Sequence, residues 1–285
     1  LKIQQFINKA KKLSFSEFNY TNFEKLGLGG QAAAFKADSS FDKCPVTIRV
    51  FIKETDPCRL SRQIQQIDEQ TVKYPYVQHS LRYHEMLVEQ RPSTCITGKT
   101  VLIQVLEYAP LRLQDYVEAN SLQPAVQEKI IKQLATALYK MHDNKILHRD
   151  VKPDNIYLDK DFNCMLSDLG IARSSDCSLK TQIGTPSYTA PEVWKVAFES
   201  ETQSFAEYDS EVDAWSLGCV VYYMQYGRDL FDSVAIDQIE AYLSEEKFEE
   251  SDPFPKHVMQ QLIQVDPLKR KQNWMDLRTE LEIKQ

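Results

Sequence analysis

Four side chains suited to one kind of chemistry stand close together in the middle of the sequence. Asp150, Lys152 and Asn155 lie within a single short segment, and Asp168 follows soon after them. An aspartate can orient a hydroxyl group and accept its proton, while a lysine ammonium can stabilise a phosphate that moves between two oxygens. Asn155 and Asp168 offer the hard oxygen atoms that Mg²⁺ prefers. Together these groups predict transfer of a phosphoryl group to a hydroxyl group.

The motifs around these residues resemble, in order and spacing, the catalytic and activation loops of eukaryotic-type protein kinases of the serine/threonine branch. The motifs are His148-Arg149-Asp150, Ser167-Asp168-Leu169-Gly170, Gly184-Thr185-Pro186 and Ala190-Pro191-Glu192. The resemblance implies that Asp150, Lys152 and Asn155 are catalytic, that Asn155 and Asp168 hold Mg²⁺, and that ATP is the phosphate donor. Lys152 favours serine or threonine over tyrosine as the acceptor.

The segment before the third motif contains a candidate regulatory site. Thr181 lies shortly before Thr185, where many kinases carry an activating phosphothreonine. A phosphate adds about −1.5 to −2 charge and would dock on Arg149, which would order the segment. Rival acceptors are Ser174, Ser175 and Ser178. The site implies an upstream activating kinase, and Thr185 itself is expected to contact the catalytic aspartate and lysine.

Residues 23–37 predict a strand, a glycine turn and a second strand, which would let backbone N–H groups approach phosphates. Gly27 and Gly29 match the first two glycines of the kinase glycine-rich loop, whereas Ala32 takes the third place and Ala34 replaces the usual valine. The resemblance also implies that adenine bonds to the backbone of a hinge. The implied nucleotide-binding residues are Leu26, Gly27, Gly29, Ala34, Thr47, Arg49, Glu107 and Ala109.

The strand expected over residues 46–53 carries two candidates for the cation that holds the nucleotide phosphates. Counting from Gly27 with the family's usual separation reaches Arg49, where the family has a lysine, whereas a longer turn would deliver Lys53. Both residues face the same side of a strand. We favour Arg49 because it requires no insertion, although its planar guanidinium differs from a lysine ammonium.

The partner of this cation is expected on a helix that includes residues 60–69. The family has a glutamate on this helix. The local sequence pattern selects Gln63, and counting back from the next strand selects Gln65, so a glutamine stands there in either alignment. Lys53 with Glu69 is the alternative pair. Either way, the N-terminal lobe is atypical for the resembled family.

The remaining pattern predicts an α+β, bilobal fold with a small β-rich lobe and a larger, mostly helical lobe. Asp213, on a buried helix, is expected to brace the catalytic loop, and Arg270 is expected to pair with Glu192. A short amphipathic helix is expected over residues 1–13. Further expected elements are strands over 77–87 and 100–106, a helix through 126–141 and a helix over 208–219. The expected domains are an N-terminal extension 1–19, an N-lobe 20–106, and a hinge and C-lobe 107–285.

The composition argues against some classes of partner and favours certain cell compartments. A net charge of −7 in 285 residues argues against nucleic-acid and anionic-membrane partners, and no apolar run is long enough for a membrane helix. Six scattered cysteines favour a reducing compartment, hence the cytoplasm or the nucleus. We therefore expect an ATP-dependent kinase acting on serine or threonine of a protein substrate. The alternative is a pseudokinase-like scaffold or regulatory binding module with weak or no phosphotransfer.

Overall fold

The computed structural model forms two compact units. One consists of Leu1–Val72 and Gln78–Ala109, the other of Lys73–Val77 and Pro110–Gln285. Within them the structure describes residues 12–28, 32–51, 57–71, 73–90, 97–169, 173–174, 185–194, 209–232, 234, 238–245 and 253–283.

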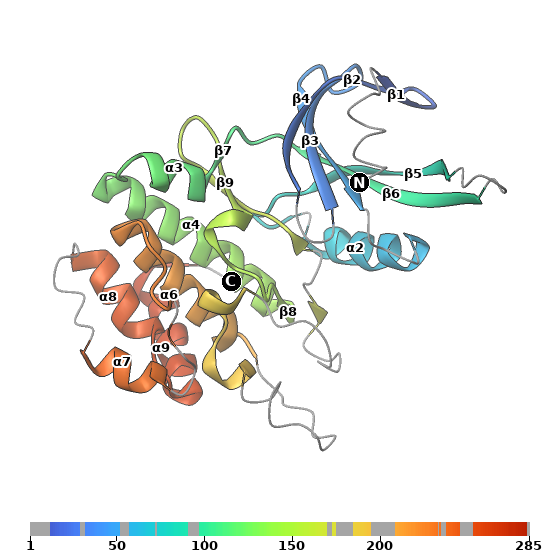
Figure 1. Cartoon of the computed structure of the whole chain (residues 1–285). Coiled ribbons are helices and arrows are strands. Elements are labelled where there is room, and N and C mark those ends of the chain that lie inside the picture. The colour runs from blue at the N-terminus through green and yellow to red at the C-terminus, as the bar shows by residue number, and fades with distance from the viewer. Residues whose placement is uncertain are drawn as a thin grey trace. The chain divides into compact units, whose positions relative to one another are not determined.

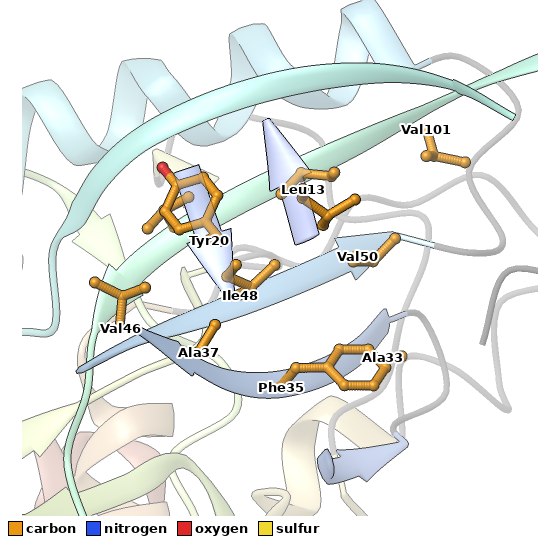
Figure 2. Packing of buried hydrophobic residues seen from close by; sticks show 11 residues of the cluster. Leu13, Tyr20, Ala33, Phe35, Ala37, Val46, Ile48, Val50 and Val101 are labelled. Carbon is orange, nitrogen blue, oxygen red and sulfur yellow. The ribbon is translucent and has the colours of Figure 1, made fainter. Parts of the chain in front are cut away.

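The first unit is built on a six-stranded antiparallel sheet in the order β1-β2-β3-β4-β6-β5 (Figure 1). The strands are β1 Lys12–Phe15, β2 Phe18–Leu28, β3 Ala32–Ser39, β4 Pro45–Phe51, β5 Ser80–Gln90 and β6 Thr97–Glu107. Successive side chains of a strand point to opposite faces, so alternate apolar residues gather on one face. Figure 2 shows this core, to which β1 contributes Leu13 and β2 contributes Tyr20.

The opposite face of the sheet carries a smaller buried cluster of Ala32, Phe51 and Leu102. Helix α2, Pro57–Thr71, contacts β5 and β6, and Figure 1 shows it beside these two strands. Because residues 46, 48 and 50 of β4 enter the large core, Thr47 and Arg49 belong to this second face.

The second unit consists mostly of helices. They are α3 Leu113–Ala119, α4 Pro124–Asp143, α6 Glu211–Tyr226, α7 Ile239–Glu245, α8 Pro253–Leu262 and α9 Pro267–Glu280. Helix α6 is buried from Glu211 to Met224 and contacts α4, α8 and α9 (Figure 1). A Cβ atom at Gly218 would lie 2.8 Å from Cγ1 of Ile263, so the glycine permits the close approach of α6 to the end of α8.

Short strands and 3₁₀ helices hold the loops of the second unit. They are β7 Leu111–Arg112, β8 Ile146–Leu147, β9 Ile156–Leu158, β10 Cys164–Leu166, β11 Arg173–Ser174, η1 Pro153–Asn155 and η3 Pro186–Tyr188. Strands β10, β9 and β7 form one small sheet, and β11 pairs with β8. The loop that carries Asp150 runs between β8, which pairs with β11, and η1, which leads directly into β9.

The expected α+β, bilobal class is confirmed, as are the main strands and helices. The helix expected over residues 1–13 is wrong at its end, because Lys12 and Leu13 lie in β1, where Leu13 enters the sheet core. Residues 1–11 lie outside the described part. Strand β1 falls within the expected extension 1–19, yet it belongs to the sheet. One division between the two units falls after Ala109. The expected domain boundary after residue 106 stays a prediction.

Candidate active site

The Asp150 carboxylate lies at the centre of a group of polar side chains. Asn155 donates from Nδ2 to Oδ2 of Asp150 at 2.8 Å and also to its backbone oxygen at 2.8 Å. The ammonium of Lys152 lies 3.0 Å from Oδ2, and the hydroxyl of Thr185 donates to Oδ1 at 3.1 Å. The structure therefore brings together three residues that the sequence assigned to catalysis.

Thr185 links the lysine to the aspartate. Its hydroxyl accepts a hydrogen bond from Nζ of Lys152 at 2.6 Å and donates its own hydrogen to Asp150. A hydroxyl has one hydrogen to donate, so these two bonds fix the direction of that hydrogen. The contacts expected for Thr185 are confirmed, and they hold the ammonium next to the carboxylate.

His148 ties the segment of Asp150 to the segment of Asp168. Its ring is fully buried, and its Nε2 lies 2.9 Å from the backbone oxygen of Ser167. A carbonyl oxygen only accepts, so Nε2 carries the hydrogen, and Nδ1 is left to accept the Asp150 backbone N–H at 3.3 Å. The neutral ring thus connects the backbone of one carboxylate to the residue before the other.

Asp213 supports the same loop through hydrogen bonds to its backbone, as expected from the sequence. Its fully buried carboxylate accepts hydrogen bonds from the backbone N–H groups of His148 and Arg149, both at 2.8 Å, and from Nε2 of His142 at 2.8 Å. Burial alone would raise the pKa of Asp213, but the hydrogen bond from His142, the neighbouring imidazole rings of His142 and His148 and the Arg149 amide outweigh it and lower that pKa. The carboxylate therefore stays ionised under the loop.

The backbone at two site residues adopts an uncommon conformation. Arg149 has a φ of 70° and Asp168 a φ of 67°, in the left-handed region that residues other than glycine rarely adopt. Such a residue costs about 1–3 kcal/mol and persists only where its surroundings hold it. For Arg149 that support includes the bond from its own N–H to Asp213.

The expected pair between Glu192 and Arg270 is also confirmed. Arg270 is fully buried. Besides the carboxylate of Glu192 it binds the backbone oxygen of Glu211 at 2.8 Å and that of Gln264 at 2.5 Å. Burial lowers the pKa of Arg270, which its acidic neighbours partly offset. The guanidinium thereby joins the start of α6, the turn before α9 and the segment that follows η3.

Three residues of the expected nucleotide-binding set lie next to one another on the sheet of the first unit. Gly27 pairs with Ala34, Ala34 pairs with Arg49, and Arg49 pairs with Gln104, which forms one row across β2, β3, β4 and β6. The Arg49 guanidinium lies 5.5 Å from the ring centre of Phe51. The sequence singled out Gly27, Ala34 and Arg49, but not Gln104 and not the registry of the row.

The other expected nucleotide residues have different surroundings. Leu26 is 44% exposed, Glu107 is exposed, and Ala109 is buried. Thr47 pairs with Lys36 on one side and with Leu106 on the other. Gly29, Lys53 and Thr181, together with the side chain of Gln63, lie outside the described residues.

A partly buried carboxylate on α2 was missed by the sequence analysis. Asp68 receives a hydrogen bond from Ser80, and Ser80 Oγ in turn accepts from Gln104 at 2.6 Å and from Tyr83 at 2.8 Å. Burial raises the pKa of Asp68 to about 6, partly offset by Ser80. The chain of bonds ends at Gln104, the cross-strand neighbour of Arg49. Helical periodicity gave no signal for Asp68, because polar residues dominate α2.

The raised pKa of Asp68 predicts how stability changes with pH. A carboxyl group whose pKa rises on folding binds its proton more tightly in the native state, so its contribution to stability is full below pH 4 and is lost as the pH rises through about 6. We expect Asp68→Asn to raise the free energy of unfolding at pH 8 by about 1–3 kcal/mol, with a smaller gain at pH 5. Urea unfolding at several pH values measures this difference, with the exposed neighbour Glu69→Gln as control. A gain that does not depend on pH would contradict the prediction.

Gln78 is a second polar residue that the sequence analysis passed over. It is 5% exposed and donates from Nε2 to the backbone oxygen of Glu107 at 2.7 Å. A carbonyl oxygen has two lone pairs, so this bond occupies one of them and fixes the orientation of the peptide group. Gln78 thus orients one of the two backbone positions expected to bind adenine.

Asn155 and Asp168 have the donor atoms that a divalent cation requires. Both hydrogen bonds recorded for the Asn155 side chain use Nδ2, whose two hydrogens point to Asp150. The amide oxygen Oδ1 is therefore the atom that Asn155 can offer to a cation, and the Asp168 carboxylate offers further oxygens of the same hard type. These residues fit Mg²⁺.

Fold and site together define an α+β protein equipped to transfer phosphoryl groups. Residues 20–277 match the model of the protein kinase domain family, and the chain belongs to that family. It is 32% identical over 223 residues to the serine/threonine-protein kinase fused of Drosophila melanogaster, covering 74% of this chain and 24% of that protein. Over 181 residues it is 32% identical to a carbon catabolite-derepressing protein kinase of Candida tropicalis, covering 61% of this chain and 28% of that protein.

A third relative, serine/threonine-protein kinase 36 of Pongo abelii, is 29% identical over 269 residues, which cover 90% of this chain. The chain spans 19% to 28% of the length of these relatives. The resemblance stated from the motifs is confirmed. Among the described residues, no helix is long and apolar enough to cross a membrane.

Proposed function

We propose that this chain is a serine/threonine protein kinase domain that transfers the γ-phosphate of ATP to a hydroxyl group of a protein substrate. The observation that carries the proposal is the Asp150 carboxylate, held by Asn155, Lys152 and Thr185 at 2.8, 3.0 and 3.1 Å. Such a carboxylate has a fixed direction before any substrate binds, as electrostatic and acid–base catalysis require.

In this proposal Asp150 accepts a hydrogen bond from the substrate hydroxyl and orients its oxygen toward the γ-phosphorus. It takes the hydroxyl proton as the new O–P bond forms, while the bond from the γ-phosphorus to the bridging oxygen breaks and ADP leaves. Lys152 lies beside Asp150 and supplies positive charge for the transferring phosphoryl group. Thr185 keeps the ammonium in place through its 2.6 Å bond. A bound Mg²⁺, held by Asn155 and Asp168, would neutralise charge on the ATP phosphates.

The first unit would hold the nucleotide. Gly27, Ala34 and Arg49 form one row of the sheet, with Leu26, Gly29, Thr47, Glu107 and Ala109 completing the proposed set. Arg49 is the proposed contact to the phosphates. Its partner on α2 is proposed to be Gln65, which is half-buried, or Gln63.

The proposal also covers how the kinase activity is regulated and in which cell compartment the protein acts. Thr181 is the proposed activating phosphosite, modified by an upstream kinase, with Arg149 as the group that binds its phosphate. Cys44, Cys164 and Cys219 are free thiols, which supports a reducing compartment and hence the cytoplasm or the nucleus. A scaffold without phosphotransfer would not require the Asp150 group, and no observation favours it.

The direct test is incorporation of phosphate from Mg-ATP into a generic basic protein. We expect transfer to serine or threonine and not to tyrosine, before or after treatment with an activating kinase. No transfer above an Asp150→Asn control under either condition would refute the proposal.

A separate prediction concerns the cation of the first unit. We expect Arg49→Ala to raise the Kd for Mg-ATP at least about tenfold, since the loss of a charge-assisted contact costs on the order of 1.5–3 kcal/mol. Lys53→Ala is the matched control and should change the Kd little. Calorimetric titration of both variants decides between the two alignments, and the reverse result would assign the phosphates to Lys53.

A further inference from the structure

Trp274 of α9 contacts a residue that the catalytic loop depends on. Its indole Nε1 lies 3.2 Å from Nδ1 of His142, near the end of α4. The Trp274 ring is 2% exposed and stacks on the ring of Tyr139, with ring centres 3.8 Å apart. Two neighbouring residues of α4 therefore fix the position of one indole group.

The chemistry of the indole group decides where the hydrogen of His142 lies. Indole N–H can only donate a hydrogen bond, so Nδ1 of His142 is the acceptor. A neutral imidazole then carries its hydrogen on Nε2, which faces Oδ2 of Asp213 at 2.8 Å. The other tautomer would present a lone pair to the carboxylate and an N–H to the indole N–H, and both contacts would be repulsive.

The tautomer of His142 affects the backbone just before Asp150, because both interact with Asp213. The carboxylate that receives the His142 hydrogen also accepts the N–H groups of His148 and Arg149. Arg149 has the left-handed φ of 70°, and the next residue is Asp150. A carboxylate that loses one of its donors can shift, and the strained backbone that it holds can then relax.

We propose that Trp274 is a positioning residue of the phosphotransfer site, because its indole N–H selects the His142 tautomer that donates to Asp213 and thereby fixes the loop that carries Asp150. The proposal rests on the proposed kinase function. Trp274 touches neither nucleotide nor acceptor in this role. It acts through His142 and Asp213, so its effect belongs to turnover and not to substrate binding.

Two variants distinguish the proposed effect of the Trp274 indole N–H on turnover from a general contribution of Trp274 to stability. Trp274→Phe keeps an aromatic ring against Tyr139 and removes the N–H. Tyr139→Phe keeps the indole N–H and removes a different buried hydrogen bond, the one from the Tyr139 hydroxyl to the Trp274 backbone oxygen. Both should lower the Tm, because each deletes one buried hydrogen bond. We expect kcat to fall about fivefold to twentyfold in Trp274→Phe alone, with KM for ATP and for the peptide within about twofold.

The tautomer is measured directly by ¹⁵N NMR of the histidine side chains, with His142→Gln used to assign the signals. The parent protein and Tyr139→Phe should show His142 with its hydrogen on Nε2, and Trp274→Phe should show a mixture. Hydrogen exchange of the Arg149 amide should accelerate about tenfold or more in Trp274→Phe only. An unchanged tautomer, or equal kcat in both variants, would overturn the proposal. If the parent transfers no phosphate, the proposed kinase function fails, while NMR and hydrogen exchange still decide the coupling of Trp274 to the loop.

Discussion

Asp150→Asn is expected to lower kcat by about 10²–10⁴-fold while the protein stays folded. The amide has nearly the shape of the carboxylate but cannot take a proton, and it presents an NH₂ group to one of the two donors, Asn155 or Thr185. Binding of Mg-ATP should change little, because the proposed nucleotide contacts lie on other residues. Steady-state turnover with a peptide substrate, together with a thermal melt, measures both effects.

The matched control for this variant is Asp154→Asn on the same loop. Asp154 makes an ion pair with Arg112 at 3.1 Å, and its side chain is 42% exposed. A surface substitution of this kind changes energies by about 0.5 kcal/mol or less, so kcat should stay within about threefold of the parent value. Comparable losses of kcat in the two variants would mean that the loop tolerates no substitution. The assignment of Asp150 as the catalytic base would then have no support from this experiment.

Arg270→Met is expected to reduce the free energy of unfolding by about 3–5 kcal/mol. The guanidinium is fully buried, and it binds the Glu192 carboxylate and two backbone oxygens. Its removal leaves these acceptors without their buried donor, which is the costly way to break such a pair. Chemical unfolding at pH 7 measures the loss.

The adjacent residue provides the control for Arg270. Lys271 pairs with Asp209 at 3.0 Å, and both side chains are about two-fifths exposed, at 43% and 41%. Exposed pairs contribute about 0–1 kcal/mol, so Lys271→Met should be nearly neutral. If the two variants lose similar stability, the buried contacts of Arg270 do not stabilise the second unit more than an exposed ion pair does.

Local patterns were sufficient to predict the main elements and to identify three residues that the structure brings together. Asp150, Lys152 and Asn155 lie within six residues, so the turn that contains them determines their mutual distances. The strand over β4 was predicted because its β-branched residues alternate, and the same alternation placed Arg49 on the face away from the large core. These inferences use only short-range geometry, which sequence spacing carries.

Long-range contacts could not be predicted in this way. Asp68 was missed because its burial depends on Ser80 and Gln104, which belong to other strands, and a polar residue on a polar helix gives no signal by itself. The short β1 was read as part of a helix because its pairing with β2 is decided by the fit of Leu13 to the sheet core. Trp274 was missed because its partners lie on α4, far away in sequence.

The separation between His142 and Trp274 has a consequence for how the protein is made. They are 132 positions apart, and Glu192 and Arg270 are 78 positions apart. A ribosome releases the catalytic segment well before it releases α9, and domains form in the order of synthesis. We therefore expect nascent chains that end before residue 270 to hold the Asp150 loop loosely and to resist protease only after α9 has emerged. Phosphotransfer competence would then arise only after α9 has left the ribosome.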